Sequence, residues 1–172
     1  YFCLKDKNMT LIRSISGIRG TIGGVPDQNL TPIDVVKFSS AYGMMLKARC
    51  TNHQPKVVIG RDARISGEMI QSLVINSLIA MGIDVISLEL STTPTVEFAV
   101  VNENADGGIV LTASHNPAQW NALKLLNERG EFIDATQGAE LIKIAESESF
   151  EYSNYDSLGK LSRVDDYIEK HI

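Results

Sequence analysis

The sequence has 172 residues, a length that suits one domain with a short appendage. Hydrophobic residues make up 44% and charged residues 22%, which is typical of a folded globular protein and excludes a disordered or fibrous chain. The formal net charge of -5 argues against the broad basic surface that binds nucleic acid, but it is compatible with a local basic pocket for a small anion.

The two cysteines, Cys3 and Cys50, belong neither to a CxxC pair nor to a Cys/His cluster with metal-ligand spacing. We therefore expect neither a disulfide scaffold nor a zinc site. No apolar run is long enough to span a bilayer, and the first residues lack the ordered regions of a signal peptide. These features predict a cytoplasmic protein without a membrane partner. Residues 1–8 precede Met9, and we expect no function of them.

The predicted elements begin with an apolar run over residues 11–15, which the glycine-rich stretch 17–24 interrupts as a loop before a second strand. Residues 31–34 (TPID) then combine a threonine cap, a proline at the first helical position and a carboxylate three residues after the cap. They predict the start of a helix, and apolar residues at helical spacing continue it to Leu46.

The rest of the chain alternates between short apolar runs and capped amphipathic segments. The expected elements are a strand at 56–60, a loop at 61–64, a helix that Ser66 caps and that ends near Gly82, a strand at 84–88, a helix from Thr93-Pro94 to Val100, a strand at 107–112, a strand at 121–126, and a helix to Ala145 that starts with a capping box of Asp134 and Gln137.

This alternation, with short connections, predicts an α/β fold: a three-layer α/β/α sandwich around a mainly parallel, mixed sheet. In such a fold, ligands collect at the carboxyl ends of the strands. We expect the compact domain to cover residues 9–148. The segment 149–172, polar at first and amphipathic from Val164 on, is expected to be a linker followed by the start of a missing second domain.

The hexapeptide Thr112-Ala113-Ser114-His115-Asn116-Pro117 places four polar side chains and a proline directly after a predicted buried strand. By composition alone, an ordinary turn and a functional loop explain it equally well, because Ser and Asn-Pro are common in turns. The glycine stretch 17–24 has neither the Gly-Lys-Ser/Thr of a Walker loop nor a GxGxxG fingerprint between a strand and a helix, so nucleotide binding is not expected.

The hexapeptide resembles the catalytic serine loop of the α-D-phosphohexomutases, which include phosphoglucomutases, phosphomannomutases and phosphoglucosamine mutases. Three further segments resemble the family in the same order: Ser16–Gly20, Gly60–Arg64 and Trp120–Lys124. The chain departs from the family at Ala122, where glycine is usual, and at Trp120, where tyrosine is common. A left-handed backbone at Ala122 would make alanine costly there.

The resemblance implies the first domain of a four-domain, Mg²⁺-dependent enzyme. Its serine, here Ser114, is stored as a phosphoester, gives its phosphoryl group to a hexose monophosphate and retakes one from the hexose 1,6-bisphosphate intermediate. The metal is implied to bind Ser114 through its phosphate, together with an aspartate-rich loop of the second domain that has no counterpart in this sequence. The partners implied are a phosphorylated hexose and the missing domains, and the fragment alone is expected to be inactive.

The resemblance also implies roles for other residues. Arg19 is expected to bind the reacting phosphate, Lys124 to exchange a proton with the sugar hydroxyl or neutralise charge, and His115 to position the phosphoester or move a proton. Arg61, Asn116 and Asn121 are candidates for phosphate or substrate binding. Asn116 could instead hold the loop, and Asp62 is expected to brace the site rather than bind.

Several alternatives remain open from the sequence. Arg19 could be an exposed arginine of a hairpin, Lys124 a solvated surface charge and His115 a simple loop residue. A serine hydrolase is disfavoured because adjacent Ser114 and His115 rarely meet as nucleophile and base, and because no Gly-x-Ser-x-Gly elbow occurs. The main alternatives to a phosphoglucomutase/phosphomannomutase are a phosphoglucosamine mutase and a non-catalytic phosphate-binding module.

Overall fold

The computed structural model describes residues 9–14, 17–165 and 167–171, so Cys3 and Ser16 lie outside the described residues. The elements in chain order are β1 Ile12–Ser14, β2 Gly17–Thr21, α1 Pro32–Arg49, β3 Lys56–Arg61, α2 Gly67–Ala80, β4 Asp84–Leu90, α3 Thr93–Asn102, β5 Gly107–Leu111, β6 Trp120–Leu126, α4 Ala135–Ser147, β7 Leu161–Arg163 and α5 Tyr167–His171. None of the helices among these residues is long and apolar enough to cross a bilayer.

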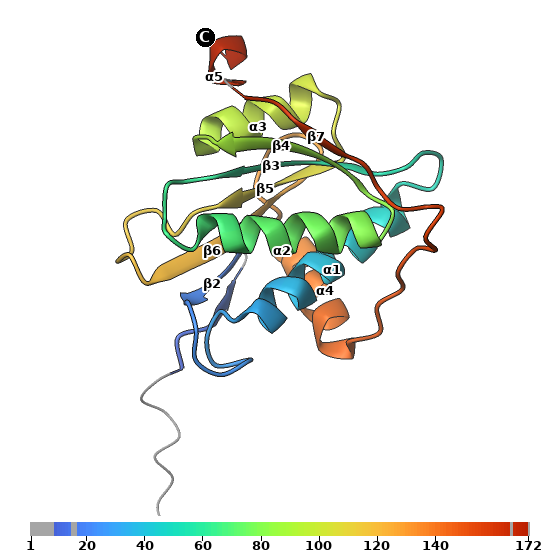
Figure 1. Cartoon of the computed structure of the whole chain (residues 1–172). Helices are drawn as coiled ribbons and strands as arrows, with labels where there is room; N and C mark the ends of the chain where they lie inside the picture. The colour runs from blue at the N-terminus through green and yellow to red at the C-terminus, as the bar shows by residue number, and fades with distance from the viewer. Residues whose placement is uncertain (1–8, 15–16, 166, 172) are drawn as a thin grey trace, which may run out of the picture.

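Helices cover both faces of one seven-stranded sheet, as Figure 1 shows, with α1, α2 and α4 on one face and α3 on the other. The strand order is β1-β2-β6-β5-β3-β4-β7. Strands β5, β3, β4 and β7 run parallel, whereas β1, β2 and β6 join the sheet through antiparallel pairs. The predicted α/β/α sandwich with a mixed sheet is thereby confirmed, and its parallel part is confined to one half of the sheet.

Part of the glycine-rich stretch is a strand, so the loop expected from residue 17 onward is wrong for its first five residues. Gly17–Thr21 forms β2, which pairs antiparallel with both β1 and β6. Gly17 has a φ of 112°, and a Cβ at this position would lie 2.2 Å from the carbonyl oxygen of Leu123. Glycine is required here because two backbones approach closely, and it does not signal a flexible loop.

The predicted helix starts are confirmed at α1 and α4, where both capping boxes are formed. The backbone N–H of Thr31 donates to Asp34 at 3.0 Å, and the N–H of Gln137 donates to Asp134 at 2.8 Å. Ser66 does precede α2, but its side chain makes no capping hydrogen bond. Its hydroxyl group is instead used in a contact with β6, described below.

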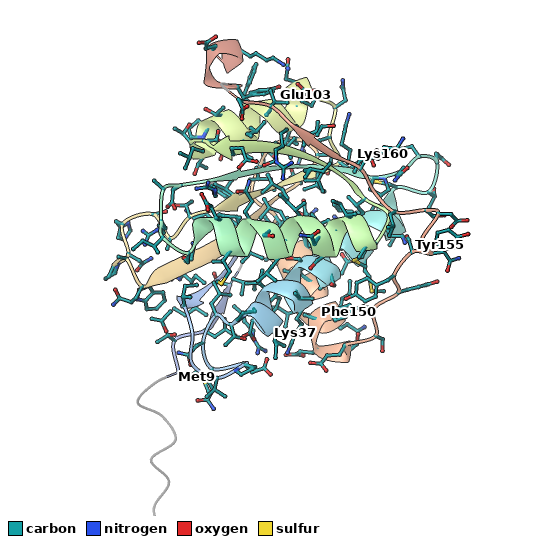
Figure 2. All side chains as sticks on the ribbon, viewed as in Figure 1. Met9, Lys37, Glu103, Phe150, Tyr155 and Lys160 are labelled. Atoms are coloured by element: carbon teal, nitrogen blue, oxygen red, sulfur yellow. The ribbon has the colours of Figure 1, made fainter. Side chains whose placement is uncertain are left out.

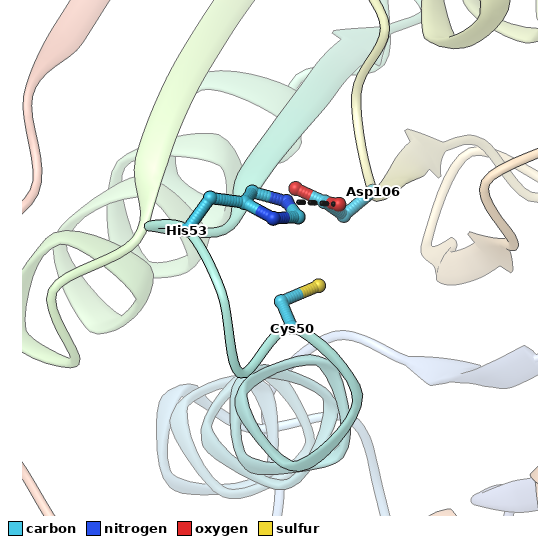
Figure 3. A group of neighbouring side chains, drawn as sticks. All are labelled: Cys50, His53 and Asp106. Atoms are coloured by element: carbon cyan, nitrogen blue, oxygen red, sulfur yellow. Dashed lines mark hydrogen bonds and ion pairs between the residues drawn. The ribbon is translucent and has the colours of Figure 1, made fainter.

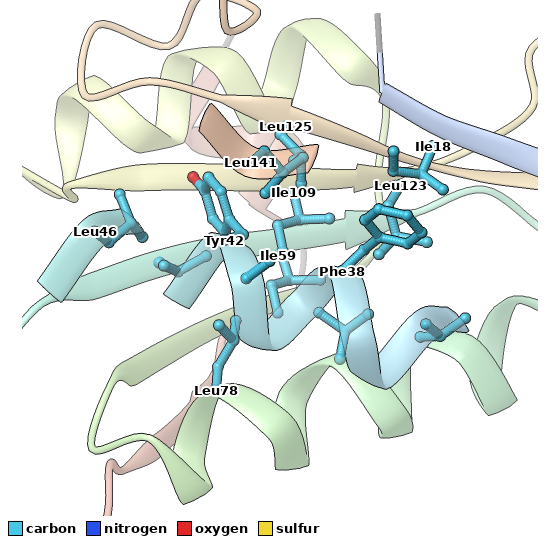
Figure 4. Packing of buried hydrophobic residues seen from close by; sticks show 14 of the residues in the cluster. Ile18, Phe38, Tyr42, Leu46, Ile59, Leu78, Ile109, Leu123, Leu125 and Leu141 are labelled. Carbon is cyan, nitrogen blue, oxygen red and sulfur yellow. The ribbon is translucent and has the colours of Figure 1, made fainter. Parts of the chain in front are cut away.

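Two hydrophobic clusters fix the helices on the sheet. The larger lies between the sheet and helices α1, α2 and α4, and Figure 4 shows part of it around Tyr42 and Phe38. The smaller one joins α3 and Tyr167 to the other face. The hydroxyl of the fully buried Tyr42 donates to the carbonyl oxygen of Leu126 at 2.6 Å, which satisfies the one polar atom that this ring brings into the core.

Residues 149–172 are expected to be a linker followed by the start of a second domain, and in the structure part of this segment adds a strand to the sheet. Leu161–Arg163 forms β7, which pairs parallel with β4 at the sheet edge. Tyr167 is 2% exposed and packs edge-to-face on Phe98, with ring centroids 6.4 Å apart. Figure 2 marks Tyr155 and Lys160 on this returning segment. A strand of three residues carries too little pattern for sequence analysis to detect, and the predicted domain boundary at residue 148 stays a prediction.

Candidate active site

The serine loop leaves the sheet at the carboxyl end of β5, beside the carboxyl end of β3, because Leu111 and Arg61 are paired at the ends of these parallel strands. Ser114 is exposed and has a left-handed backbone, with a φ of 54°. A non-glycine residue in this conformation costs of the order of 1 kcal/mol or more, so surrounding contacts must hold it there. One of them is the backbone N–H of Ser114, which donates to Thr112 Oγ1 at 3.0 Å.

Asn116 closes the loop on itself. Its backbone N–H and its side-chain Nδ2 both donate to the carbonyl oxygen of Ala113, at 3.0 and 2.8 Å. The amide group therefore acts as the loop-holding contact that the sequence suggested for this residue. A direct role of Asn116 in phosphate binding stays a prediction.

Arg64 holds the serine loop from the neighbouring β3–α2 connection. Its guanidinium donates to four backbone carbonyl oxygens of the loop, at 2.8 to 3.1 Å: those of Ser114, Asn116, Pro117 and Trp120. The Nε atom also donates to Asp62 Oδ2 at 3.1 Å, so this carboxylate orients the guanidinium. The expected bracing role of Asp62 is thus exerted on Arg64, and not on Arg61. Sequence analysis assigned no role to Arg64, since a contact with residues 50 or more positions away leaves no local signal.

Lys124 reaches the serine hydroxyl. Its Nζ donates to Ser114 Oγ at 2.6 Å and lies 5.9 Å from the centroid of the Phe132 ring. The pairing of Lys124 with Val110 in the β6–β5 ladder places the lysine next to the strand that leads into the loop. This arrangement puts a positive charge at the oxygen that would carry a phosphoryl group.

Arg19 lies on the same face of the sheet as Lys124. It is directly opposite Ala122 in the β2–β6 pair, and Ala122 and Lys124 are two residues apart on one strand. The Arg19 side chain is exposed. Ala122 is in the strand and not among the residues with positive φ, so the left-handed backbone considered for it does not occur and alanine is unstrained there.

Arg61 and Asn121 are buried, and both side chains make hydrogen bonds to other residues of the fold. Arg61 donates from Nε to Gln71 at 2.7 Å and from a terminal nitrogen to Glu68 at 3.2 Å, which ties β3 to α2. Asn121 is fully buried and donates to Ser66 Oγ at 2.9 Å. These contacts show that both residues support the site, and the predicted role of either in binding phosphate stays a prediction.

His115 is exposed beside Ser114 in the loop. The hydroxyl of Ser114 contacts Lys124, and this is not the serine–histidine hydrogen bond of a hydrolase. Within the described part of the chain, no group of three Cys, His or carboxylate ligands surrounds Ser114. The site can therefore stabilise an anion on Ser114 with its own cations, but it lacks the protein ligands for a metal ion.

Comparisons with known proteins give one consistent family. The family model described as phosphoglucomutase/phosphomannomutase, alpha/beta/alpha domain I, matches residues 11–152. A Thermococcus kodakarensis protein named phosphoglucomutase/phosphomannomutase is 38% identical over 155 residues, which cover 89% of this chain and 34% of that relative. A Pyrococcus abyssi protein named probable phosphoglucosamine mutase is 36% identical over 157 residues, which cover 90% of this chain and 33% of the relative.

The fold has counterparts among solved structures. The structure of a putative phosphomannomutase from Thermus thermophilus matches with a TM-score of 0.75 and 26% identity, over 90% of this chain and 33% of that one. A phosphoglucomutase/phosphomannomutase family protein from Burkholderia thailandensis matches with a TM-score of 0.72 and 27% identity, over 92% of this chain and 33% of that one. The chain thus spans about a third of the length of these relatives.

Proposed function

This chain belongs to the phosphoglucomutase/phosphomannomutase family, and on that premise we propose that it is the phosphoserine-bearing first domain of an α-D-phosphohexomutase. The contact of 2.6 Å between Lys124 Nζ and Ser114 Oγ, on a loop that Arg64 holds, is the observation that supports the proposal most strongly. The net reaction is the interconversion of a hexose 1-phosphate and a hexose 6-phosphate through a hexose 1,6-bisphosphate.

In the first transfer, the bond between phosphorus and Ser114 Oγ breaks while a bond forms between phosphorus and a sugar hydroxyl oxygen. The proton of that hydroxyl ends on Ser114 Oγ. Lys124 Nζ can give its proton to Oγ as negative charge builds there, and can then take up the proton released by the sugar. Arg19 is proposed to hold the moving phosphoryl group with its planar guanidinium. The second transfer, from the bisphosphate back to Ser114, reverses these steps.

Magnesium dependence, the bisphosphate intermediate and a cytoplasmic location belong to this proposal. A bound Mg²⁺ would neutralise charge on the phosphoryl oxygens. This chain would contribute only Ser114, through its phosphate. The site fits that role because Ser114 is exposed, and the carboxylate ligands would come from the part of the protein beyond this third.

The hexose remains the least specified part of the proposal. The curated relatives carry the names of both phosphoglucomutase/phosphomannomutase and phosphoglucosamine mutase. We propose a glucose or mannose phosphate first and glucosamine phosphate as the alternative, because the family model bears the former names. The parts that would distinguish these sugars lie in the two thirds of the relatives that this chain does not cover.

The test is the covalent state and the activity of the intact protein. Peptide mass spectrometry should find phosphate on Ser114, and Ser114→Ala should abolish mutase activity with glucose 1-phosphate and mannose 1-phosphate. A matched control is Ser149→Ala, at an exposed serine outside the loop, which should keep both rates. Full activity of Ser114→Ala would sink the nucleophile assignment. Phosphosugar binding without turnover by the wild-type protein would favour the non-catalytic module.

A further inference from the structure

A second cluster of reactive side chains lies at the amino ends of strands β3 and β5. Cys50 ends α1, His53 lies in the connection to β3, and Asp106 directly precedes β5. Since β3 and β5 are parallel, their amino ends lie side by side. Ser114 lies at the opposite, carboxyl ends of these strands. The sequence alone predicts no zinc site at Cys50, but the fold brings these three residues together, as Figure 3 shows.

The three ligand atoms are close enough to share one ion. The Cys50 sulfur, a His53 ring nitrogen and an Asp106 carboxylate oxygen all lie within 4.8 Å of one another. Ligand atoms around a tetrahedral zinc ion, with bonds of about 2.0–2.3 Å, are separated by roughly 3.3–3.8 Å. His53 Nε2 is now 2.7 Å from Asp106 Oδ1, so a small movement of the imidazole, on an exposed connection, would admit the ion.

The carboxylate is already oriented by the sheet. Asp106 Oδ2 accepts the backbone N–H of Lys56 at 2.8 Å, which leaves Oδ1 directed at His53. A ligand held by a second hydrogen bond is what stabilises a metal centre, because it loses less freedom when the ion binds. The side chain of Asp106 is 16% exposed, whereas that of His53 is 58% exposed and can adjust.

We propose that Cys50, His53 and Asp106 form a binding site for Zn²⁺ or a similar borderline-soft divalent ion. A thiolate, an imidazole and a carboxylate are a zinc ligand set, and the thiolate discriminates against Mg²⁺ and Ca²⁺, which prefer oxygen. A cleft of about 290 Å³ opens beside the cluster, and Glu128 also lines it. Water in this cleft would complete the coordination of the ion.

A cysteine nucleophile activated by His53 is the rival explanation of the cluster. An activated thiol needs a ring nitrogen of the histidine as its hydrogen-bond partner. His53 Nε2 instead bonds to Asp106 Oδ1 at 2.7 Å, so the imidazole is paired with the carboxylate. A shared metal ion accounts for the gathering of all three side chains, because each of them is a zinc ligand.

The position of the cluster suggests a structural brace. The ion would join the α1–β3 connection, which carries Cys50 and His53, to Asp106 before β5, and these two segments are brought together only by folding. An ion that binds the folded state and not the unfolded state raises the free energy of unfolding. The effect grows with the zinc concentration. The proposal is independent of the mutase reaction, since Ser114 lies at the opposite ends of strands β3 and β5.

The test is metal binding by the intact protein after removal of metals, with Mg²⁺ in excess to fill oxygen sites. Zinc added to the metal-free protein should bind at one equivalent and should raise the midpoint of thermal unfolding. Substituted Co²⁺ should give the thiolate-to-cobalt charge-transfer band in the near ultraviolet. Cys50→Ser should abolish this band, and Cys50→Ser and His53→Gln should each weaken zinc binding by about tenfold to a hundredfold or more.

Cys3→Ser and His171→Gln are the matched controls, because they remove another thiol and another imidazole, and both should keep the band and the zinc affinity. The midpoints of the metal-free variants report folding separately. The proposal is overturned if Cys50→Ser keeps the charge-transfer band, if Cys3→Ser loses it, or if the wild-type protein retains no more zinc than the Cys50→Ser/His53→Gln double variant.

Discussion

At the scale of single residues, the site depends on one serine in an unfavourable backbone conformation. Ser114 has a φ of 54° and is exposed, so packing does not hold it. The Arg64 guanidinium and the Asn116 amide hold the loop through backbone carbonyl oxygens. The exposed hydroxyl is thereby presented to Lys124, which is the preorganisation that the proposed phosphoryl transfer would require.

Replacement of Lys124 tests the charge at the serine oxygen. Lys124→Ala in the intact protein should lower kcat/KM by about tenfold to a hundredfold, because a charge-assisted hydrogen bond contributes roughly 1.5–3 kcal/mol. The pH profile of kcat should also change if Lys124 carries the proton. Lys143→Ala, at an exposed lysine of α4, is the control. An unchanged rate and pH profile would return Lys124 to the role of a solvated surface lysine.

Replacement of Arg64 tests the position of the loop. Arg64→Lys keeps the charge but loses the planar fork that contacts four carbonyl oxygens, so kcat should fall by about tenfold to a hundredfold with a smaller change in KM. Hydrogen exchange should accelerate at the amides of residues 114–116 and stay unchanged in β5. Arg129→Lys, at an exposed arginine, should alter neither quantity. Normal loop protection in Arg64→Lys would show that the fork is not what holds the loop.

At the scale of elements, ion pairs connect the β2–α1 loop to the helices beneath the sheet. Asp27 accepts from Arg13 and Lys37, both at 2.8 Å, and Lys37 also pairs with Glu148 at the end of α4. The hydrogen bond from Lys37, with a smaller contribution from Arg13, lowers the pKa of Asp27 below its ordinary value of 3.8, although burial opposes the shift. A lowered pKa in the folded state means that ionised Asp27 stabilises the fold.

This stabilisation has a defined pH range. It is fully present above the unfolded-state pKa of Asp27 and is lost as the pH falls through the lower folded-state pKa. Asp27→Asn, which tolerates the left-handed φ of 64°, should lower the unfolding free energy at neutral pH by at most about 1 kcal/mol, because the pairs are partly exposed. Urea unfolding from neutral pH to about pH 2 should show the difference vanish in acid. A difference that persists there, or an equal effect of Asp156→Asn, would contradict the assignment.

At the scale of the whole molecule, the segment after α4 completes the sheet. Gly159 crosses so close to the sheet that a Cβ would lie 1.9 Å from the carbonyl oxygen of Ile83. The Val85 N–H donates to the Lys160 carbonyl oxygen at 2.8 Å, so the crossing protects the edge of β4. Part of the segment that the sequence presents as a linker therefore packs on the sheet, through the pairing of β7 with β4.

Gly159→Ala tests whether this crossing stabilises the domain. The clash is with backbone, which cannot move without displacing β7, so a loss of roughly 1–3 kcal/mol in unfolding free energy is expected. Hydrogen exchange at the Val85 amide should accelerate, whereas protection in β5 should persist. Ser162→Ala, at an exposed residue of β7, is the control. Unaltered protection at Val85 would show that the segment contributes little to the domain.

The sequence by itself determined the local features of this protein. Capping residues, such as the Asp134–Gln137 box, specify where helices start, and the alternation of apolar runs with helices specified the layered α/β fold. The motif around Ser114 also indicated the family, which the match over residues 11–152 confirms. These signals are contained in a few neighbouring residues, so no knowledge of the chain's path is needed to recognise them.

Only the tertiary structure decided which distant residues meet. It made Gly17–Thr21 a strand, because the tight approach to Leu123 depends on β6. It joined Arg64 to the serine loop, turned Asn121 toward Ser66, and assembled Cys50, His53 and Asp106 at the amino ends of β3 and β5. The physical reason is common to all of them: the pairing of strands in the sheet places far-separated segments side by side, and a contact across that distance leaves no pattern in the local sequence.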